Sequence, residues 1–164
     1  MLIRLKNKDT LHFDDFLFKC TIGKKGISSK KKEGDFSTPK GIFSIKYLYY
    51  RPDRLTKPET KIIVKKLKKN MGWCNDPKNK KYNSLIKIKE KIRHEKIYRR
   101  DHKYDIIIVI DYNMKPVISG KGSAIFLHLA SKNFSTTKGC IAIKKREFLQ
   151  ILPYIEKKTK LFIY

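Results

Sequence analysis

Two side chains in the sequence, Cys140 and His128, together have the chemistry for nucleophilic catalysis. Cys140 follows Gly139 at the start of the apolar run CIAI, and His128 lies 12 residues earlier, at the end of the run AIFLH. A thiolate is the attacking form of cysteine, and a neighbouring imidazole can take the thiol proton. A cysteine that follows a glycine is also typical of simple packing, so the pair alone fits both interpretations.

The two residues just before Cys140 favour a catalytic role for its thiol. The positive charge of Lys138 would lower the pKa of a nearby thiol. Gly139 would leave room for a substrate, and it would let backbone N–H groups at and beside Cys140 point at a developing oxyanion.

Strands must position this pair. The runs AIFLHLA and GCIAI predict two strands whose ends meet at one edge of a sheet, joined by the loop LASKNFSTTKG. The run at 106–110, IIIVI, predicts a buried strand. Strands are also expected at 1–5, over 12–22 with Phe16, Phe18, Cys20 and Ile22 on one face, at 42–50 and at 160–164. Residues 23–41 predict a long loop or wide hairpin.

The remaining segments are less regular. Residues 59–70 fit a strand or a short helix, and residues 86–104 are predicted to be helical or irregular. Near the end, Phe148, Leu152 and Ile155 share one helical stripe, which Pro153 should kink or end. We therefore expect one mostly β domain over residues 1–164, a β-rich α+β fold with a helix packed on a sheet.

Composition narrows the class of protein. The chain has 164 residues and a net charge of +25, but its lysines are scattered, which is typical of a solvated surface rather than a specific nucleic-acid site. Three widely spaced cysteines indicate neither a disulfide framework nor a zinc site, so no metal is expected. The start MLIRLKNKDTLHF lacks the features of a signal peptide, and no apolar run is long enough to span a bilayer.

Other residues are candidates for binding a substrate. Arg51 and Arg54 could hold a carboxylate, although a surface turn with local ion pairs is about as good an interpretation. Ser123 could donate a hydrogen bond near the site or simply belong to a turn. Trp73, Tyr82 and Asn83 could line a groove, but a loop packed by its own aromatic residues is slightly favoured.

The run GSAIFLHLA…STTKGCIAI resembles the active-site region of the YkuD-type L,D-transpeptidase catalytic domain. The segments KKEGDFSTPKGIFSI, YYRPDR, GWCNDPKNKKYN, YRRDHKYD and VIDYN also resemble blocks of its small stand-alone bacterial branch. They occur in the expected order over roughly residues 24–152.

This resemblance implies a nucleophilic role for Cys140 and a general-base role for His128, with the Leu129 carbonyl orienting the imidazole. It implies an oxyanion hole from the amides of Gly139, Cys140 and Lys138, with Thr137 shaping the loop. It further implies mixed sheets in a sandwich-like arrangement with a helix after the cysteine strand. The implied substrates are peptidoglycan stem peptides, which a thioester would carry to an acceptor amine without a cofactor, and the implied location is the cell envelope.

Three positions depart from the wider family. Lys138 replaces a histidine, Ala142 replaces an arginine or asparagine, and Leu129 replaces a glycine. The alternatives that remain are an L,D-carboxypeptidase or related acyltransferase acting on a cytoplasmic precursor, and a non-enzymatic protein that binds polyanions.

Overall fold

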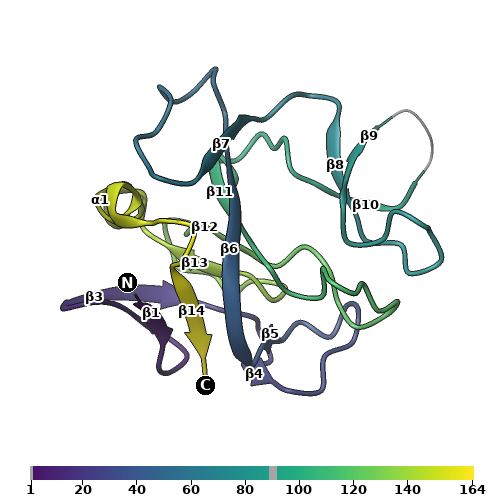
Figure 1. Cartoon of the computed structure of the whole chain (residues 1–164), viewed down its shortest axis with the longest axis horizontal. Helices are drawn as coiled ribbons and strands as arrows, with labels where there is room; N and C mark the ends of the chain where they lie inside the picture. The colour runs from purple at the N-terminus through teal and green to yellow at the C-terminus, as the bar shows by residue number, and fades with distance from the viewer. Residues whose placement is uncertain (1, 89–91) are drawn as a thin grey trace.

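The computed structural model describes residues 2–88 and 92–164 of the chain (Figure 1). It confirms a mostly β fold with a short helix late in the sequence. The helix α1 spans Lys145–Ile151 and continues into a 3-10 turn at Leu152–Tyr154. The strands are β1 Leu2–Leu5, β2 Thr10–Phe13, β3 Phe16–Thr21, β4 Ile27–Ser28, β5 Thr38–Pro39, β6 Gly41–Tyr50, β7 Ile63–Lys66, β8 Met71–Cys74, β9 Leu85–Lys87, β10 His94–Lys96, β11 Ile106–Ile110, β12 Phe126–Leu129, β13 Ile141–Ile143 and β14 Lys160–Ile163.

The long strand β6 joins the two halves of the main sheet. Its residues 41–44 pair with β14, and its residues 45–50 pair with β11. Eight strands therefore form a closed circuit, in the order β6, β11, β12, β13, β3, β2, β1 and β14. The ninth strand, β7, pairs with residues 47–50 of β6. The sheet is mixed, because β12–β13, β1–β14 and β6–β7 are parallel pairs.

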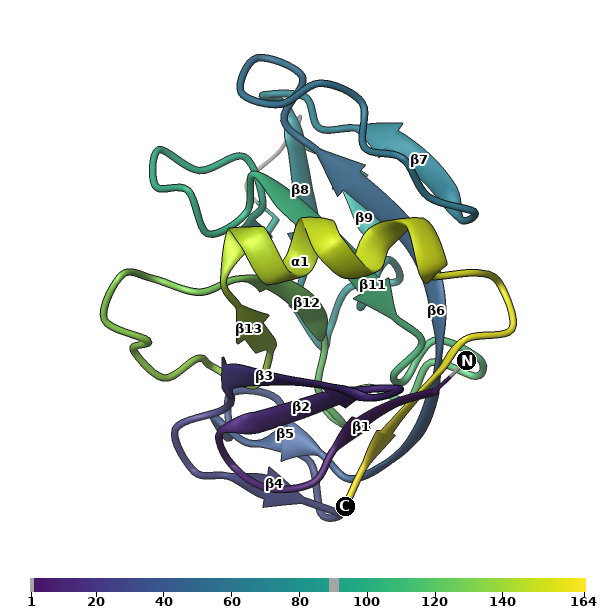
Figure 2. The ribbon, with the colours of Figure 1, turned by 90° about the vertical axis from the view of Figure 1, so that its left-hand side faces the viewer.

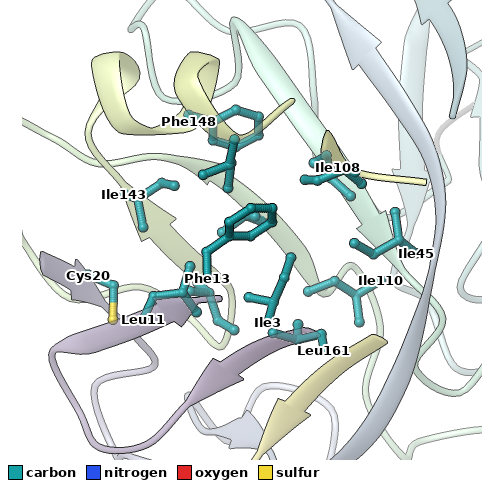
Figure 3. Close-up of a cluster of buried hydrophobic side chains, with 14 of the residues drawn as sticks. Ile3, Leu11, Phe13, Cys20, Ile45, Ile108, Ile110, Ile143, Phe148 and Leu161 are labelled. Atoms are coloured by element: carbon teal, nitrogen blue, oxygen red, sulfur yellow. The ribbon is translucent and has the colours of Figure 1, made fainter. Parts of the chain in front are cut away.

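The main hydrophobic core lies inside this circuit. Side chains alternate between the two faces of a strand, and Ile106, Ile108 and Ile110 of β11 belong to the inner cluster. The helix α1 crosses the sheet (Figure 2) and contributes Phe148, which is fully buried. Figure 3 shows Phe148 above Phe13 and Ile3 in the same cluster.

A second cluster lies on the other face of β11 and β12. It contains Ile107, Val109, Phe126 and Cys140, and it is covered by Trp73 of the small three-stranded sheet β10-β8-β9. Phe126 and His128 alternate with Leu127 and Leu129, so the reactive face of β12 is the outer face. The small sheet therefore buries the surroundings of Cys140.

Most predicted strands are confirmed, and Pro153 does follow the end of α1. The prediction of a single strand over 12–22 is wrong. The chain turns at residues 14–15 between β2 and β3, so Phe16 begins a new strand and is 49% exposed. Residues 63–66 form a strand and not a helix, and residues 23–41 hold only the short pair β4–β5. The segment 86–104 contains the end of β9 and all of β10, and it has no helix among its described residues. Residues 89–91 of this segment, like Met1, lie outside the described residues.

Within the described residues, no helix has both the length and the apolar character needed to cross a membrane.

Candidate functional site

Cys140 opens onto a pocket of about 400 Å³, here called the thiol pocket. Its walls come from four stretches of chain, namely residues 31–36, 93–104, 122–128 and 136–140, together with Asn75. His128 and Cys140 both line it, although they lie on neighbouring strands. The parallel pairing of β12 with β13 places Ala142 opposite His128, which brings the start of β13 to the reactive face of β12.

The Cys140 thiol is buried and protonated at rest. Its Sγ donates a hydrogen bond to the carbonyl oxygen of Ala124 at 3.2 Å and accepts one from the backbone N–H of Phe126 at 3.4 Å. Burial raises the pKa of the thiol to about 12, because a thiolate loses more solvation than a thiol in an apolar setting. In the described part of the chain, the thiol therefore points to a carbonyl group and not to His128.

The His128 ring is held in one orientation. Its Nδ1 lies 2.9 Å from the carbonyl oxygen of Leu129, and the edge of the Tyr104 ring packs against it with centroids 5.0 Å apart. A carbonyl oxygen can only accept, so Nδ1 carries the proton in the neutral ring and Nε2 is left with a free lone pair. Burial lowers the pKa of His128 to about 4, which keeps the ring neutral at pH 7.

Lys138 does not have the expected effect on the thiol. Its side chain is exposed, and the cation whose charge opposes the rise in the pKa of Cys140 is Lys31. Lys31 is buried, and its Nζ pairs with Asp35 and donates to the carbonyl oxygen of Ser37 at 2.7 Å. A buried charge acts through a lower effective dielectric than a solvated one, which explains the correction.

Gly139 lies in a close contact between two loops. Its φ is +136°, and a Cβ at this position would lie 2.7 Å from the carbonyl oxygen of Ser37. The Thr38 hydroxyl also donates to the Gly139 carbonyl at 2.9 Å, which ties the two loops together. This position therefore requires glycine for both its conformation and its space.

Thr137 shapes the turn before Cys140. Its hydroxyl accepts a hydrogen bond from Gly139 N–H at 3.1 Å and donates one to the carbonyl oxygen of Cys140 at 2.6 Å. The Gly139 N–H expected to face an oxyanion is therefore already occupied. Among the described residues, the Cys140 N–H has no such acceptor.

The sequence matches the family model of the YkuD L,D-transpeptidase catalytic domain over residues 3–163. The chain belongs to this family. A search of curated proteins finds no match.

Two similar solved structures are those of the helical cell shape determining protein Pgp2 from Campylobacter jejuni and of a single-substitution variant of it. Both are 18% identical to this L,D-transpeptidase-family chain, with TM-scores of 0.49 and 0.48. Each alignment covers 99% of this chain and 46% or 45% of the other, so the chain spans less than half the length of these proteins.

The two arginines proposed from the sequence lie elsewhere in this YkuD-type domain. Arg51 is buried, stacks on the Tyr98 ring at 3.6 Å and forms two hydrogen bonds with Asp53. Arg54 pairs with Asp105 at 2.7 Å and donates to backbone carbonyls of residues 100 and 101. Both arginines hold the loop 98–105 in place, because Arg51 also donates to the carbonyl oxygen of Arg99.

The aromatic candidates also have structural partners. Trp73 is buried against Phe126, and its Nε1 donates to Asn83 at 3.0 Å. Asn83 in turn donates to the carbonyl oxygens of Tyr112 and Asn113 and accepts from the Ala124 N–H. Trp73 and Asn83 therefore lie behind the pocket, as the packed-loop interpretation predicted, and fix the segment 112–124.

Ser123 does line the thiol pocket, and Tyr82 supports it from behind. Both hydroxyls donate to the Glu33 carboxylate, at 2.7 Å from Ser123 and 2.5 Å from Tyr82. The Tyr82 oxygen also accepts the Gly122 N–H at 3.0 Å. Glu33 therefore joins the loop 31–36 to the turn 122–125 across one side of the pocket.

Sequence reasoning missed one wall of the pocket, which carries Glu95, Arg99, Lys103 and Tyr104. The Tyr104 hydroxyl donates to Glu95 at 3.3 Å, and the Arg99 guanidinium lies 5.0 Å from the Tyr104 ring centroid. The quoted block YRRDHKYD contains three of these residues, but its local sequence gives no sign of which side chains face a pocket.

Proposed function

We propose that this chain is a cysteine-dependent L,D-transpeptidase that acts on peptidoglycan stem peptides. The observation that carries the proposal is the shared pocket of Cys140 and a neutral His128 whose Nε2 lone pair is free. Membership of the L,D-transpeptidase family supports the substrate class. Such an activity serves cell-wall organisation and cell shape, and its site of action is the cell envelope.

In the proposed reaction, Cys140 Sγ attacks the carbonyl carbon of an L,D-peptide bond while its proton moves to Nε2 of His128. The tetrahedral intermediate collapses to a thioester, and the imidazolium gives the proton to the leaving amine of the terminal D-amino acid. An acceptor amine then attacks the thioester and restores the thiol.

The resting hydrogen bond of Cys140 sets the first step. The thiol must turn from the Ala124 carbonyl toward His128 before it can be deprotonated. Because the thiol pKa is raised and the His128 pKa is lowered, proton transfer accompanies attack and does not precede it as a stable ion pair.

The backbone N–H of Cys140 is the donor we assign to the oxyanion. It belongs to the nucleophile itself, so it lies next to the carbon that Sγ attacks. Thr137 supports this arrangement, because its hydroxyl fixes the Gly139 N–H and the Cys140 carbonyl on either side of that amide.

The test is incubation of the protein with a tetrapeptide muropeptide, with and without an acceptor amine, followed by mass spectrometry. We expect D-alanine release, a thioester on Cys140 and a cross-linked product when the amine is present. Release without any cross-linked product would instead identify the alternative, an L,D-carboxypeptidase.

Cys140→Ala should abolish turnover, whereas Cys74→Ala is the matched control. Cys74 is also a fully buried free cysteine, but it lies outside the pocket lining as described. Turnover retained in Cys140→Ala would contradict the nucleophile assignment.

A further inference from the structure

Lys103 stands out among the cations of the thiol pocket. Lys31 is neutralised by Asp35, and Arg99 is paired with Glu95 and Asp101. Lys103 also lines the pocket and is partly buried, yet its ammonium group has no carboxylate partner in the part of the chain that the structure describes. Its charge contributes to the lowered pKa of Asp101, but that carboxylate is paired with Arg99. A partly buried cation that forms no ion pair of its own favours binding of an anion.

The backbone fixes Lys103 beside the base. Its carbonyl oxygen accepts the N–H of Leu129 at 3.0 Å, one residue from His128, and its own N–H donates to Asp101 at 3.2 Å. Asp101 is held in turn by the Arg99 guanidinium. Lys103 therefore lies in the chain segment bonded next to His128 and lines the same pocket, and its charge is among those that lower the pKa of that ring.

We propose that Lys103 binds the carboxylate of the residue that leaves the acyl donor, so that the site selects donors with a free terminal carboxylate. This inference rests on the proposed function. His128 gives its proton to the leaving amine, so the leaving residue must lie on the His128 side of the scissile bond. In a terminal amino acid, the carboxylate carbon is attached to the same Cα as that amine, which brings it toward Lys103.

Binding of this carboxylate also assists the base. Burial is the main cause of the lowered pKa of His128, and the positive charges of Lys103 and Arg99 add to it, while Asp101 opposes it. A carboxylate paired with Lys103 cancels part of this repulsion and makes the imidazolium easier to form. The correct substrate thus helps to activate the enzyme, and a donor without a terminal carboxylate does not.

The first test needs no turnover. Cys140 is alkylated with iodoacetate, which carries a carboxylate, and with iodoacetamide, which is neutral and of similar size, and the modified peptide is quantified by mass spectrometry. Lys103→Met should lower the iodoacetate-to-iodoacetamide rate ratio by about tenfold, as expected for loss of one charge-assisted hydrogen bond. Lys103→Arg should largely retain the ratio.

Lys132→Met is the matched control, because Lys132 is an exposed lysine outside the residues that line the described pocket. It should leave the ratio unchanged. An unchanged ratio in Lys103→Met would overturn the proposal. An equal fall in Lys32→Met, at an exposed lysine of the pocket, would also overturn it by showing general attraction of anions.

The second test compares tetrapeptide donors that end in a carboxylate or in an amide. The wild-type protein should favour the acid in kcat/KM, and Lys103→Met should remove most of this preference while still releasing the terminal amide residue. A preference kept in Lys103→Met would contradict the proposal. Absence of turnover with either donor would contradict the proposed function, whereas the alkylation ratio would still decide whether Lys103 binds a carboxylate.

Discussion

At the scale of single residues, Cys140 and His128 have opposite pKa shifts with the same main cause. Burial raises the thiol pKa to about 12 and lowers the imidazole pKa to about 4, so each group is kept in its neutral form. Hydrogen bonding of Phe126 N–H to the sulfur and the charge of Lys31 oppose the first shift only in part. The resting site therefore holds a thiol and an imidazole.

This charge state predicts how Cys140 reacts with pH. Its alkylation by iodoacetamide should quicken about tenfold for each unit between pH 7 and pH 9, with no plateau, because the thiolate fraction grows in proportion. The measurement is the rate of modification of the Cys140 peptide. A plateau reached below pH 7 would contradict the prediction, since it would indicate a preformed ion pair.

His128 also predicts an acid dependence of stability. Its pKa is lower in the folded protein than the ordinary value of 6.5, so its contribution is fully present above pH 6.5 and is lost as the pH falls toward about 4. The whole loss amounts to about 3 kcal/mol.

Urea unfolding at several pH values measures this contribution. His128→Gln cannot be protonated and should show a smaller loss of unfolding free energy between pH 6.5 and pH 4.5 than the wild-type protein. Parallel curves for the two proteins would contradict the assignment.

The sequence indicated these two residues but not their environment. The spacing of Cys140, Gly139 and His128 left a packing interpretation open, and the resemblance to the YkuD-type domain favoured a catalytic pair. The effect expected from Lys138 was wrong because proximity in sequence does not determine solvent exposure, and the buried cation Lys31 lies 109 positions from Cys140 in the chain.

At the scale of elements, the segment 36–38 is held between two glycines. The Phe36 carbonyl oxygen lies 2.5 Å from where a Cβ of Gly23 would be, and the Ser37 carbonyl oxygen lies 2.7 Å from that of Gly139. Thr38 bonds to both sides, because its hydroxyl accepts from Gly23 N–H and donates to the Gly139 carbonyl. The loop before Cys140 is thus positioned by a distant part of the chain.

Gly139→Ala should therefore destabilise the protein by about 2 kcal/mol or more and strongly reduce turnover, because the new Cβ meets backbone at a positive φ. Denaturant unfolding and the muropeptide assay measure the two effects.

Gly120→Ala is the matched control for this substitution. Gly120 also has a positive φ, of +75°, but a Cβ there has no neighbour within 4 Å in the described structure. It should show only the conformational cost, about 1 kcal/mol. Equal effects at the two glycines would contradict the close contact.

Local sequence patterns were sufficient to locate most strands but not to predict which segments they pair with or contact. Alternation and β-branched runs located β11, β12 and β13, and Pro153 marked the end of α1. The hairpin turn at residues 14–15 was missed, because DD lacks the glycine or asparagine that usually marks a tight turn. The contact of residues 36–38 with Gly139 depends on long-range packing, which no local pattern encodes.

At the scale of the whole molecule, α1 packs on the main core through Phe148 and Ile151. Phe148→Ala should lower the free energy of unfolding by about 3–5 kcal/mol, because it leaves a large cavity in the main core. Leu149→Ala changes the neighbouring residue on the same helix, which is 39% exposed, and should cost far less. Thermal or denaturant unfolding of both variants tests the difference, and similar losses would contradict it.

The net charge of +25 predicts an attraction to polyanions that salt screens. Binding to DNA should weaken steeply as salt rises and be equal in the wild-type protein and Cys140→Ala. Titrations at several salt concentrations measure this. Tight binding that persists at physiological salt would favour the polyanion-binding alternative over a catalytic role.

The expected arrangement of mixed sheets with a helix after the cysteine strand described the molecule well. Its closure into one circuit was not predicted, because it depends on β6 pairing with β14 along one half and with β11 along the other. The alternation in IFSIKYLYY identifies a strand, but it does not indicate that the strand changes partners midway.

This closure has a consequence for self-association. Exposed strand edges are where protein chains join into aggregates. In the nine-stranded sheet as described, β7 is the strand that ends the hydrogen-bonded order. It carries the exposed residues Lys65 and Lys66, and Lys65 lies over the Tyr47 ring at 4.1 Å. If a second molecule paired its own β7 with this edge, the lysines of the two strands would repel each other. The charges on β7 therefore disfavour edge-to-edge aggregation at the open end of this sheet.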